Sequence, residues 1–251
     1  MKSTRSQLKN RGMASPEEIA ACASLPWEQL MEELRSPDPC RRAAAARCMD
    51  PKSKSAAVLL LEQLAQEKCL YTRLAICETL EKGTEETAEK MLPWLGRIGK
   101  NQYKALPDKV SAKKSFPLPR DLIARSLARM DTAVFPLLLQ LFNTGSEQQI
   151  SEALDAAGFM AFYHPALADG ENAERILRLL HSHSGSEIIV WKVLPAFPPF
   201  PYRRPCGSLR DMRSETTFLE KRPNALCIWW KGKRLHRISR KRKLLPMGGK
   251  P

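Results

Sequence analysis

The stretch from Ser36 to Asp50 joins a turn containing two prolines to an alanine-rich segment. Asp38 can accept a hydrogen bond from the first turn of a helix, and Pro39 suits the first helical position, where an N–H would have no partner. Beyond them, Ala43 and Ala46 lie three residues apart and so share one helix face. Small side chains on a face let another helix approach closely. The stretch therefore predicts a helix that stacks against neighbouring helices.

The same pattern recurs further along the chain. Arg73 precedes Leu80 by seven residues, as Arg42 precedes Met49, and the two arginines are 31 residues apart. A period of this length is typical of helical repeat proteins. Each helical pair in such a protein leaves apolar surface on both flanks, and the pairs are stabilised by stacking on one another. We therefore expect Arg42 and Arg73 to occupy equivalent places and to bond carbonyls or carboxylates of the adjacent pair.

The alanine-rich stretch resembles the second helix of a HEAT repeat, including the short bacterial-type repeats similar to those of phycobilin lyases. The matching positions are Asp38, Pro39, Arg42, Ala45 and Ala46. Met49 stands for the closing Leu of the motif, whereas Arg41 replaces its usual Val. The resemblance implies an all-α fold, a right-handed α-α superhelix of about five helical pairs. It also implies that the protein binds another protein on its concave surface.

Apolar spacing, capping residues and prolines divide the chain into three parts. Residues 1–14 are expected to be a basic flexible N-terminus, residues 15–197 the helical repeat domain, and residues 198–251 a Pro/Arg-rich tail. Helices are expected at 16–23, 27–34, 38–49, 57–64, 70–80, from 85 to about 98, from about 119 to 130, and at 133–142, 147–162, 173–181 and 187–194.

The tail differs from the rest of the chain in charge and pattern. Residues 201–251 hold 15 Lys and Arg against 3 Asp and Glu, a net charge of +12, which leaves +2 of the total +14 for residues 1–200. Helical periodicity also ends there. Two explanations stay open: a disordered Pro-rich tail, or translation out of frame after about residue 194. As a native arm, the tail could bind nucleic acid, whereas a plain basic tail would bind polyanions without selectivity.

A long basic loop at residues 100–120 interrupts the third repeat. Its candidate binding residues are Lys104, Lys109, Lys113, Lys114 and Arg120. Tyr103 and Phe116 are interleaved with these cations, so the loop could grip an acidic peptide or a phosphate backbone. The alternative is a solvated connection whose aromatic side chains fold back on the core.

The sequence offers no positive sign of catalysis, and we expect no cofactor. The seven cysteines form no Cys-x-x-Cys pair, no histidine lies at metal-ligand spacing, and no nucleotide-binding or nucleophile-elbow motif occurs. No apolar run reaches the roughly 18 residues of a membrane span. The N-terminus lacks the apolar core of a secretory signal, so the expected compartment is the cytoplasm, with an organellar transit peptide as the alternative.

Two functions from different classes follow from these patterns. The first is a non-enzymatic protein-binding scaffold or adaptor that uses the concave surface and the 100–120 loop. The alternative is a HEAT-like nucleic-acid-binding protein, or a DNA glycosylase acting on alkylated bases. A reader of duplex DNA should carry a basic stripe on its folded part, whereas a protein scaffold should carry mixed charge.

Overall fold

The computed structural model describes residues 3–107, 116–197 and 199–200. All of them except Pro107 belong to one compact unit. The expected tail at 198–251 lies outside the described residues apart from positions 199 and 200, and so do Lys109, Lys113 and Lys114.

The described residues form α-helices and short 3-10 helices, and they contain no strand. In the N-terminal half the helices are α1 (Arg5–Asn10), α2 (Pro16–Ala23), α3 (Trp27–Leu34), α4 (Pro39–Cys48), α5 (Lys54–Gln66), α6 (Leu70–Leu80), α7 (Glu85–Met91) and η1 (Leu92–Trp94). In the C-terminal half they are α8 (Leu122–Leu127), η2 (Thr132–Val134), α9 (Phe135–Thr144), α10 (Glu147–Tyr163), η3 (Pro165–Leu167), α11 (Gly170–Ser182) and α12 (Glu187–Ala196). The expectation of an all-α fold is confirmed for this part of the chain.

Local capping chemistry sets many of these helix starts. Asp38 caps α4 by accepting a hydrogen bond from the backbone N–H of Cys40 at 2.8 Å, and Pro39 occupies the first helical position. Ser15 and Ser146 each form a reciprocal capping box with the residue three positions on. These pairings satisfy first-turn N–H groups that have no partner inside the helix. The helices α2, α4 and α10 therefore begin at, or within one residue of, the positions that the sequence predicted, whereas α5, α8, α9 and α11 begin two to three residues away.

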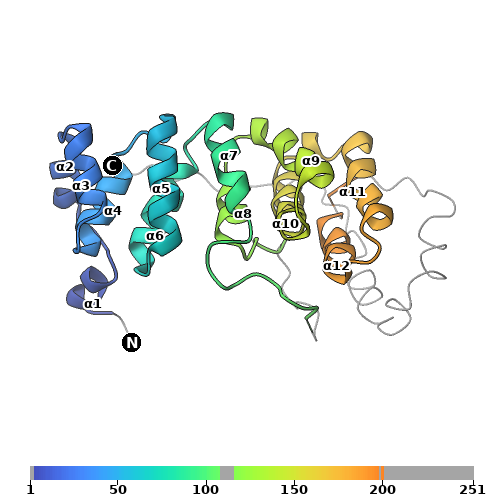
Figure 1. The fold of residues 1–251 in the computed structure, drawn as a ribbon, viewed down its shortest axis with the longest axis horizontal. Helices are drawn as coiled ribbons and strands as arrows, with labels where there is room; N and C mark the ends of the chain where they lie inside the picture. Colours follow the sequence, from blue (N-terminus) through green and yellow to red (C-terminus); the bar gives the residue numbers. More distant parts are fainter. Residues whose placement is uncertain (1–2, 108–115, 198, 201–251) are drawn as a thin grey trace, which may run out of the picture. The chain divides into compact units, whose positions relative to one another are not determined.

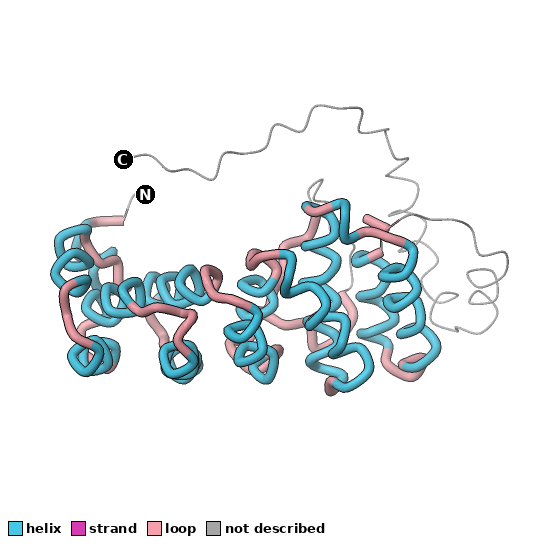
Figure 2. The backbone as a smooth tube through the Cα atoms, turned by 90° about the horizontal axis from the view of Figure 1, so that it is seen from above, coloured by secondary structure: helices cyan, strands magenta, loops and turns pink. Residues whose placement is uncertain are grey.

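The helices pack as successive pairs. Within the pairs, α3 contacts α4, α5 contacts α6, α9 contacts α10 and α11 contacts α12. Between pairs, α4, α6, α8, α10 and α12 contact one another in that order and form what we call the second-helix row. The helices α5, α7, α9 and α11 likewise form the first-helix row. The helical pairs follow one another in chain order across Figure 1, and Figure 2 shows them from above. The core runs between the two rows.

Small residues bring α4 close to its neighbours. Ala44, Ala45 and Ala46 are fully buried, and α4 contacts α2 and α3 on one side and α6 on the other. A helix face without large side chains allows this close approach. The alanine-rich segment therefore serves as the packing centre of the first two pairs.

The expectation of a flexible N-terminus was wrong for residues 5–12. Thr4 caps α1 through a reciprocal capping box with Gln7, and α1 contacts α4. The carbonyl of Arg11 accepts a hydrogen bond from the backbone N–H of Tyr71 at 2.9 Å. Gly12 is buried with a φ of +86°, and a side chain there would lie 2.3 Å from the Thr72 hydroxyl. The segment is thus docked against α4 and α6.

The third pair departs from the regular pattern earlier than expected. The helix α7 ends at Met91, and η1 follows, because Pro93 cannot donate the hydrogen bond that a continuing α-helix requires. From Leu95 to Asp121 the described residues form no helix, and we call this stretch the α7–α8 connection. At the other end, α12 extends to Ala196 and includes Pro195, slightly beyond the expected stop.

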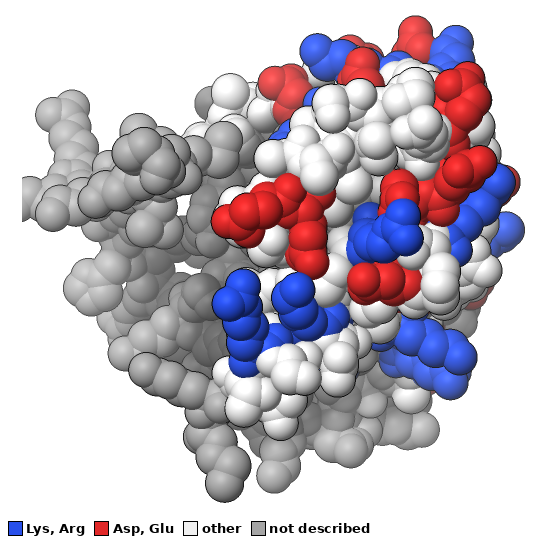
Figure 3. Space-filling view, turned by 90° about the vertical axis from the view of Figure 1, so that its left-hand side faces the viewer, with Lys and Arg blue, Asp and Glu red and all other residues white. Residues whose placement is uncertain are grey.

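Charged side chains of both signs lie side by side on the end of the unit that carries α2 and α3 (Figure 3). Two ion pairs form in this part of the chain: Arg41 of α4 pairs with Glu33 of α3, and Lys9 of α1 pairs with Glu18 of α2 at 3.2 Å. Exposed pairs of this kind contribute little to stability. Blue and red groups both occur across this face, so its charge is mixed.

Candidate functional site

Aromatic contacts hold the α7–α8 connection against the second-helix row. The ring of Tyr103 meets the ring of Trp191 in α12 edge to face, with centroids 4.9 Å apart. The guanidinium of Arg120 lies 4.3 Å from the centroid of the Tyr103 ring. A cation over an aromatic face is attracted by the negative face of the ring. Arg120, a predicted binding residue, therefore joins two distant parts of the connection to each other, whereas Trp191 joins the connection to α12.

A second aromatic contact fixes the far end of the connection. Phe116 is buried, stacks on Phe162 of α10 at 4.8 Å and meets Phe159 edge to face at 6.4 Å. The sequence left two alternatives for the 100–120 loop, and its aromatic side chains behave as in a connection whose aromatics fold back on the core. Lys104 by contrast is exposed.

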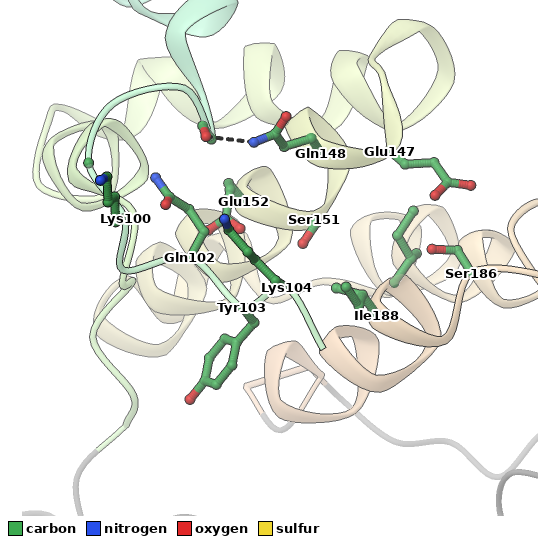
Figure 4. Close-up of a pocket in the computed structure, with 13 residues that line it drawn as sticks. Lys100, Gln102, Tyr103, Lys104, Glu147, Gln148, Ser151, Glu152, Ser186 and Ile188 are labelled. Atoms are coloured by element: carbon green, nitrogen blue, oxygen red, sulfur yellow. Dashed lines mark hydrogen bonds between the residues drawn. The ribbon is translucent and has the colours of Figure 1, made fainter. Parts of the chain in front are cut away.

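A pocket of about 510 Å³ lies between this connection and the N-terminal parts of α10 and α12 (Figure 4). The connection contributes Gly96, Gly99, Lys100, Gln102, Tyr103 and Lys104. The two helices contribute Glu147, Gln148, Ser151, Glu152, Ser186, Ile188 and Ile189. Its volume falls within the range of small-molecule and side-chain binding sites.

Gly96 lets the connection approach α10 closely enough to form the pocket wall. Its carbonyl accepts a hydrogen bond from the Gln148 side chain at 2.6 Å, drawn as a dashed line in Figure 4. Its φ is +76°, and a side chain at this position would come within 2.5 Å of Gln148. Glycine is the residue that adopts this backbone conformation without strain.

A buried cluster of charges borders the pocket. The ammonium of Lys192 in α12 is fully buried and bonds the Oε1 atom of Glu152 at 2.8 Å and the Oδ2 atom of Asp155 at 2.9 Å. It also donates to the carbonyl of Ser151 at 3.1 Å. The side chain of Glu152 is 2% exposed and that of Asp155 is 19% exposed. The cluster therefore joins α10 to α12 through charged hydrogen bonds.

The cluster shifts the pKa of each of its members. Burial raises the pKa of Glu152 to about 7, against the attraction of Lys192. Burial also raises the pKa of Asp155, again opposed by Lys192. For Lys192, burial favours the neutral amine, but the two carboxylates outweigh it and raise the pKa. The ammonium is thus charged at neutral pH, whereas Glu152 holds a proton for part of the time.

Asp121 connects this region to the start of α8. It is fully buried, caps α8 by accepting from the backbone N–H of Ala124 at 2.9 Å, and accepts from the Gln102 side chain at 2.7 Å. Burial raises its pKa, opposed by these hydrogen bonds. Its charge in turn raises the pKa values of Glu152 and Asp155.

One carboxylate oxygen of the cluster has no partner. The Oε2 atom of Glu152 is buried and makes no hydrogen bond within the described residues. Lys192 supplies one positive charge to two carboxylates, Glu152 and Asp155, so the ionised cluster has one negative charge in excess. Buried polar groups without partners are rare in native proteins, and perturbed titrating groups at a pocket are typical of functional sites.

Arg42 bonds a carboxylate from the next helical pair. Its Nε and one terminal nitrogen donate to the two oxygens of Glu67 at 2.7 and 2.9 Å, in a bidentate pair. Its other terminal nitrogen donates to the carbonyls of Ser36 at 2.8 Å and Pro37 at 3.0 Å. Glu67 directly follows α5, so the pair ties the first repeat to the second.

Arg73 does not repeat this arrangement. Its Nε atom is buried without a hydrogen-bond partner, and no hydrogen bond or ion pair of this side chain occurs within the described residues. The equivalence of Arg42 and Arg73 in the sequence therefore does not extend to their contacts. The expectation that both would bond the adjacent pair was wrong for Arg73.

Sequence reasoning missed the residues of the buried cluster. Lys192 was the one signal available, because it stands alone among the apolar residues of α12. Glu152 and Asp155 lie three residues apart on the same face of α10, between alanines and leucines. Nothing in that spacing indicates which helix faces them.

Comparison with protein-family models, curated proteins and solved structures finds no match to this chain. Within residues 3–107, 116–197 and 199–200, no three His, Cys, Asp or Glu side chains lie where they could hold a metal ion together. Across those same ranges, every helix falls short of the length and apolar character that crossing a membrane demands. The five cysteines of this part of the chain are free thiols.

Proposed function

We propose that this chain is a HEAT-type helical repeat protein that binds another protein through its second-helix row. Successive pairs with alternating helices in two rows support this fold, as does the match of Asp38 and Pro39 to the start of the HEAT second helix. The right-handed superhelical path is part of the proposal. Stacked pairs of this kind offer an extended surface for a partner.

One observation carries the choice of binding surface. The α7–α8 connection lies against α10 and α12, fixed by Tyr103 and Phe116, and encloses a pocket with an unpartnered carboxylate oxygen on Glu152. A preformed surface loses little conformational freedom on binding. Lys104 lies exposed at the same pocket, where it can contact a bound chain.

The nucleic-acid alternative has less support from the described residues. Charges of both signs are mixed on the end face in Figure 3, and Arg120 is engaged with Tyr103. The main basic feature of the chain, the tail at 198–251, lies outside the described residues apart from positions 199 and 200. We therefore propose a protein partner first.

A photo-reactive amino acid placed at position 104 tests for a protein partner inside the cells that produce this protein. Lys90 is the matched control, because it is an exposed lysine on α7 in the first-helix row. We expect position 104 to cross-link to a defined protein, and position 90 not to. Binding of that purified protein should weaken in Lys104→Gln and stay unchanged in Lys90→Gln.

Three results would overturn the proposal. The first is recovery of nucleic acid rather than protein at position 104. The second is the same set of proteins at both positions, which indicates random contact. The third is a partner whose purified form binds the Lys104→Gln variant as tightly as the unaltered chain.

A further inference from the structure

The walls of the pocket combine an aliphatic surface with a carboxylate. Ile188 and Ile189 of α12 line one side, and Ser151 and Glu152 of α10 line another (Figure 4). An apolar wall next to a buried charge suits a ligand that has a carbon chain ending in a charged or polar group. The side chains of lysine and arginine have this form.

The buried part of the cluster has one cation, Lys192, for the two carboxylates of Glu152 and Asp155. Lys192, Asp155 and Asp121 act on this cluster directly, and the other charged or titratable groups of the region are Glu147, Lys100, Lys104 and Tyr103 of the pocket lining and Arg120 over the Tyr103 ring. Lys192 already bonds Oε1 of Glu152 and one oxygen of Asp155, and Arg120 is engaged with Tyr103. The Oε2 atom of Glu152 is the buried carboxylate oxygen of this cluster that has no hydrogen-bond partner within the described residues.

We propose that this pocket binds an alkylammonium or guanidinium group, with the cation at Oε2 of Glu152 and its carbon chain against Ile188 and Ile189. Such a cation would give the pair Glu152 and Asp155 two positive charges in place of one. The proposal deepens the proposed function, and it rests on that function only where the cation is a side chain of the protein partner.

An anionic ligand fits this site less well. It would meet the Oε2 atom of Glu152 in a region of low dielectric, where repulsion between like charges is strong. Lys100 and Lys104 at the pocket are exposed, so water and salt screen their attraction for anions. A neutral donor could bond Oε2, but it would leave the excess negative charge uncompensated.

The proposed cation competes with a proton. Burial raises the pKa of Glu152 to about 7, so below this pH the carboxyl is neutral and cannot attract an ammonium. As pH increases, we therefore expect the affinity for the cation to increase about tenfold per pH unit up to about pH 7 and to level off above it. The affinity for a neutral isostere of the same ligand should show no such dependence on the ionisation of Glu152.

The experiment is a titration of the full chain, followed by calorimetry or NMR, at pH 6, 7 and 8. The probes are butylammonium, methylguanidinium and a blocked lysine peptide, with the acetyl-lysine peptide as neutral isostere. The cationic probes should bind with the rising pH profile, and the isostere should not. Glu152→Gln should abolish binding, whereas Glu89→Gln, which makes the same change at an exposed carboxylate of α7 away from the pocket, should keep it.

Each outcome has a definite consequence. Failure of every cationic probe to bind, or equal binding by Glu152→Gln, overturns the proposal. If that variant does not fold, a flat pH profile of the unaltered chain overturns it instead. Tighter binding of the peptide than of butylammonium identifies a side chain as the source, and the reverse identifies a free amine. Probe binding together with one of the three results that overturn the protein-binding function would keep the cation site and refute that function.

Discussion

Replacing Arg42 and Arg73 separately by methionine tests whether the ion pair between repeats stabilises the fold. Methionine keeps much of the aliphatic stem and removes the guanidinium. Arg42 makes four hydrogen bonds, two of them to Glu67, whose side chain is 1% exposed. Arg73 makes none within the described residues. The two positions are 31 residues apart in the same repeat register, which makes them a matched pair.

The expected loss for Arg42→Met follows from what remains around Glu67. Removing one partner of a buried ion pair costs about 3–5 kcal/mol. Glu67 keeps three hydrogen bonds, from the Gln63 side chain and from the backbone N–H groups of Lys68 and Cys69, so its charge is only partly stranded. We therefore expect a loss of about 2–4 kcal/mol, near the range of one or two charged hydrogen bonds.

Arg73→Met should behave differently. The buried Nε of Arg73 has lost its water without gaining a partner, a situation that destabilises the folded state. Removing it should leave the free energy of unfolding unchanged or raise it by up to about 1 kcal/mol.

Urea denaturation followed by circular dichroism measures both variants. With a slope of about 2–3 kcal/mol per molar urea, Arg42→Met should lower the midpoint by about 1 M, and Arg73→Met should not lower it. Equal losses for both variants would refute the reasoning, because the hydrogen bonds of Arg42 would then contribute nothing beyond its stem. No loss for Arg42→Met would refute it as well.

Three further predictions concern the pocket region. Lys192→Met should lower the free energy of unfolding by about 3–5 kcal/mol at pH 8. The loss should be smaller at pH 5, because the carboxylates that lose their cation take up protons there. Urea denaturation at both pH values measures this. The pKa of Glu152 is raised from 4.5 to about 7, so between these pH values the folded state holds a proton that the unfolded chain has released. The free energy of unfolding, measured relative to that of Glu152→Gln, should therefore fall by up to about 3 kcal/mol as pH rises from 5 to 8. Parallel pH profiles of the two proteins would contradict this. Gly96→Ala should lower the free energy of unfolding by more than about 1 kcal/mol, because Gly96 has a positive φ and contacts Gln148. Gly170→Ala is the control, since nothing lies within 4 Å of a side chain added there, and it should be neutral or slightly stabilising. Thermal melts measure both variants, and equal effects would contradict the glycine argument.

Helix positions could be predicted from the sequence because their causes are local. The bounds of α2 and α6 match the expected residues, since Ser15 and Pro16 mark one start and apolar spacing marks the other. The cap of α4 at Asp38 follows from the same logic. Capping and periodicity act over a few residues, so a single sequence contains the information. The docked α1 had the same kind of signal in Thr4 and Gln7, which the expectation of a basic flexible N-terminus passed over.

The candidate pocket could not be predicted because its residues come together through long-range packing. Glu152 and Lys192 are 40 residues apart and meet only because α10 packs against α12. Tyr103 joins them from a segment without periodicity. The spacing of charges within one helix does not reveal which face is buried by the next. Of the two predicted binding residues within the described ranges, Lys104 and Arg120, only Lys104 lines the pocket.

The departure from the repeat and the pocket have one physical origin. Counting 31 residues on from Glu67 reaches Ile98, so the third repeat has no carboxylate where the second has one. The chain there follows the glycine-containing connection instead, and a side chain added at Gly99 would lie 3.4 Å from the Arg73 guanidinium. Arg73 thus faces backbone where Arg42 faces Glu67. The same connection then forms one wall of the pocket beside Glu152. A regular third repeat with a carboxylate at position 98 would offer Arg73 an ion pair, whereas the irregular connection leaves Arg73 unpaired among the described residues and supplies the pocket wall instead.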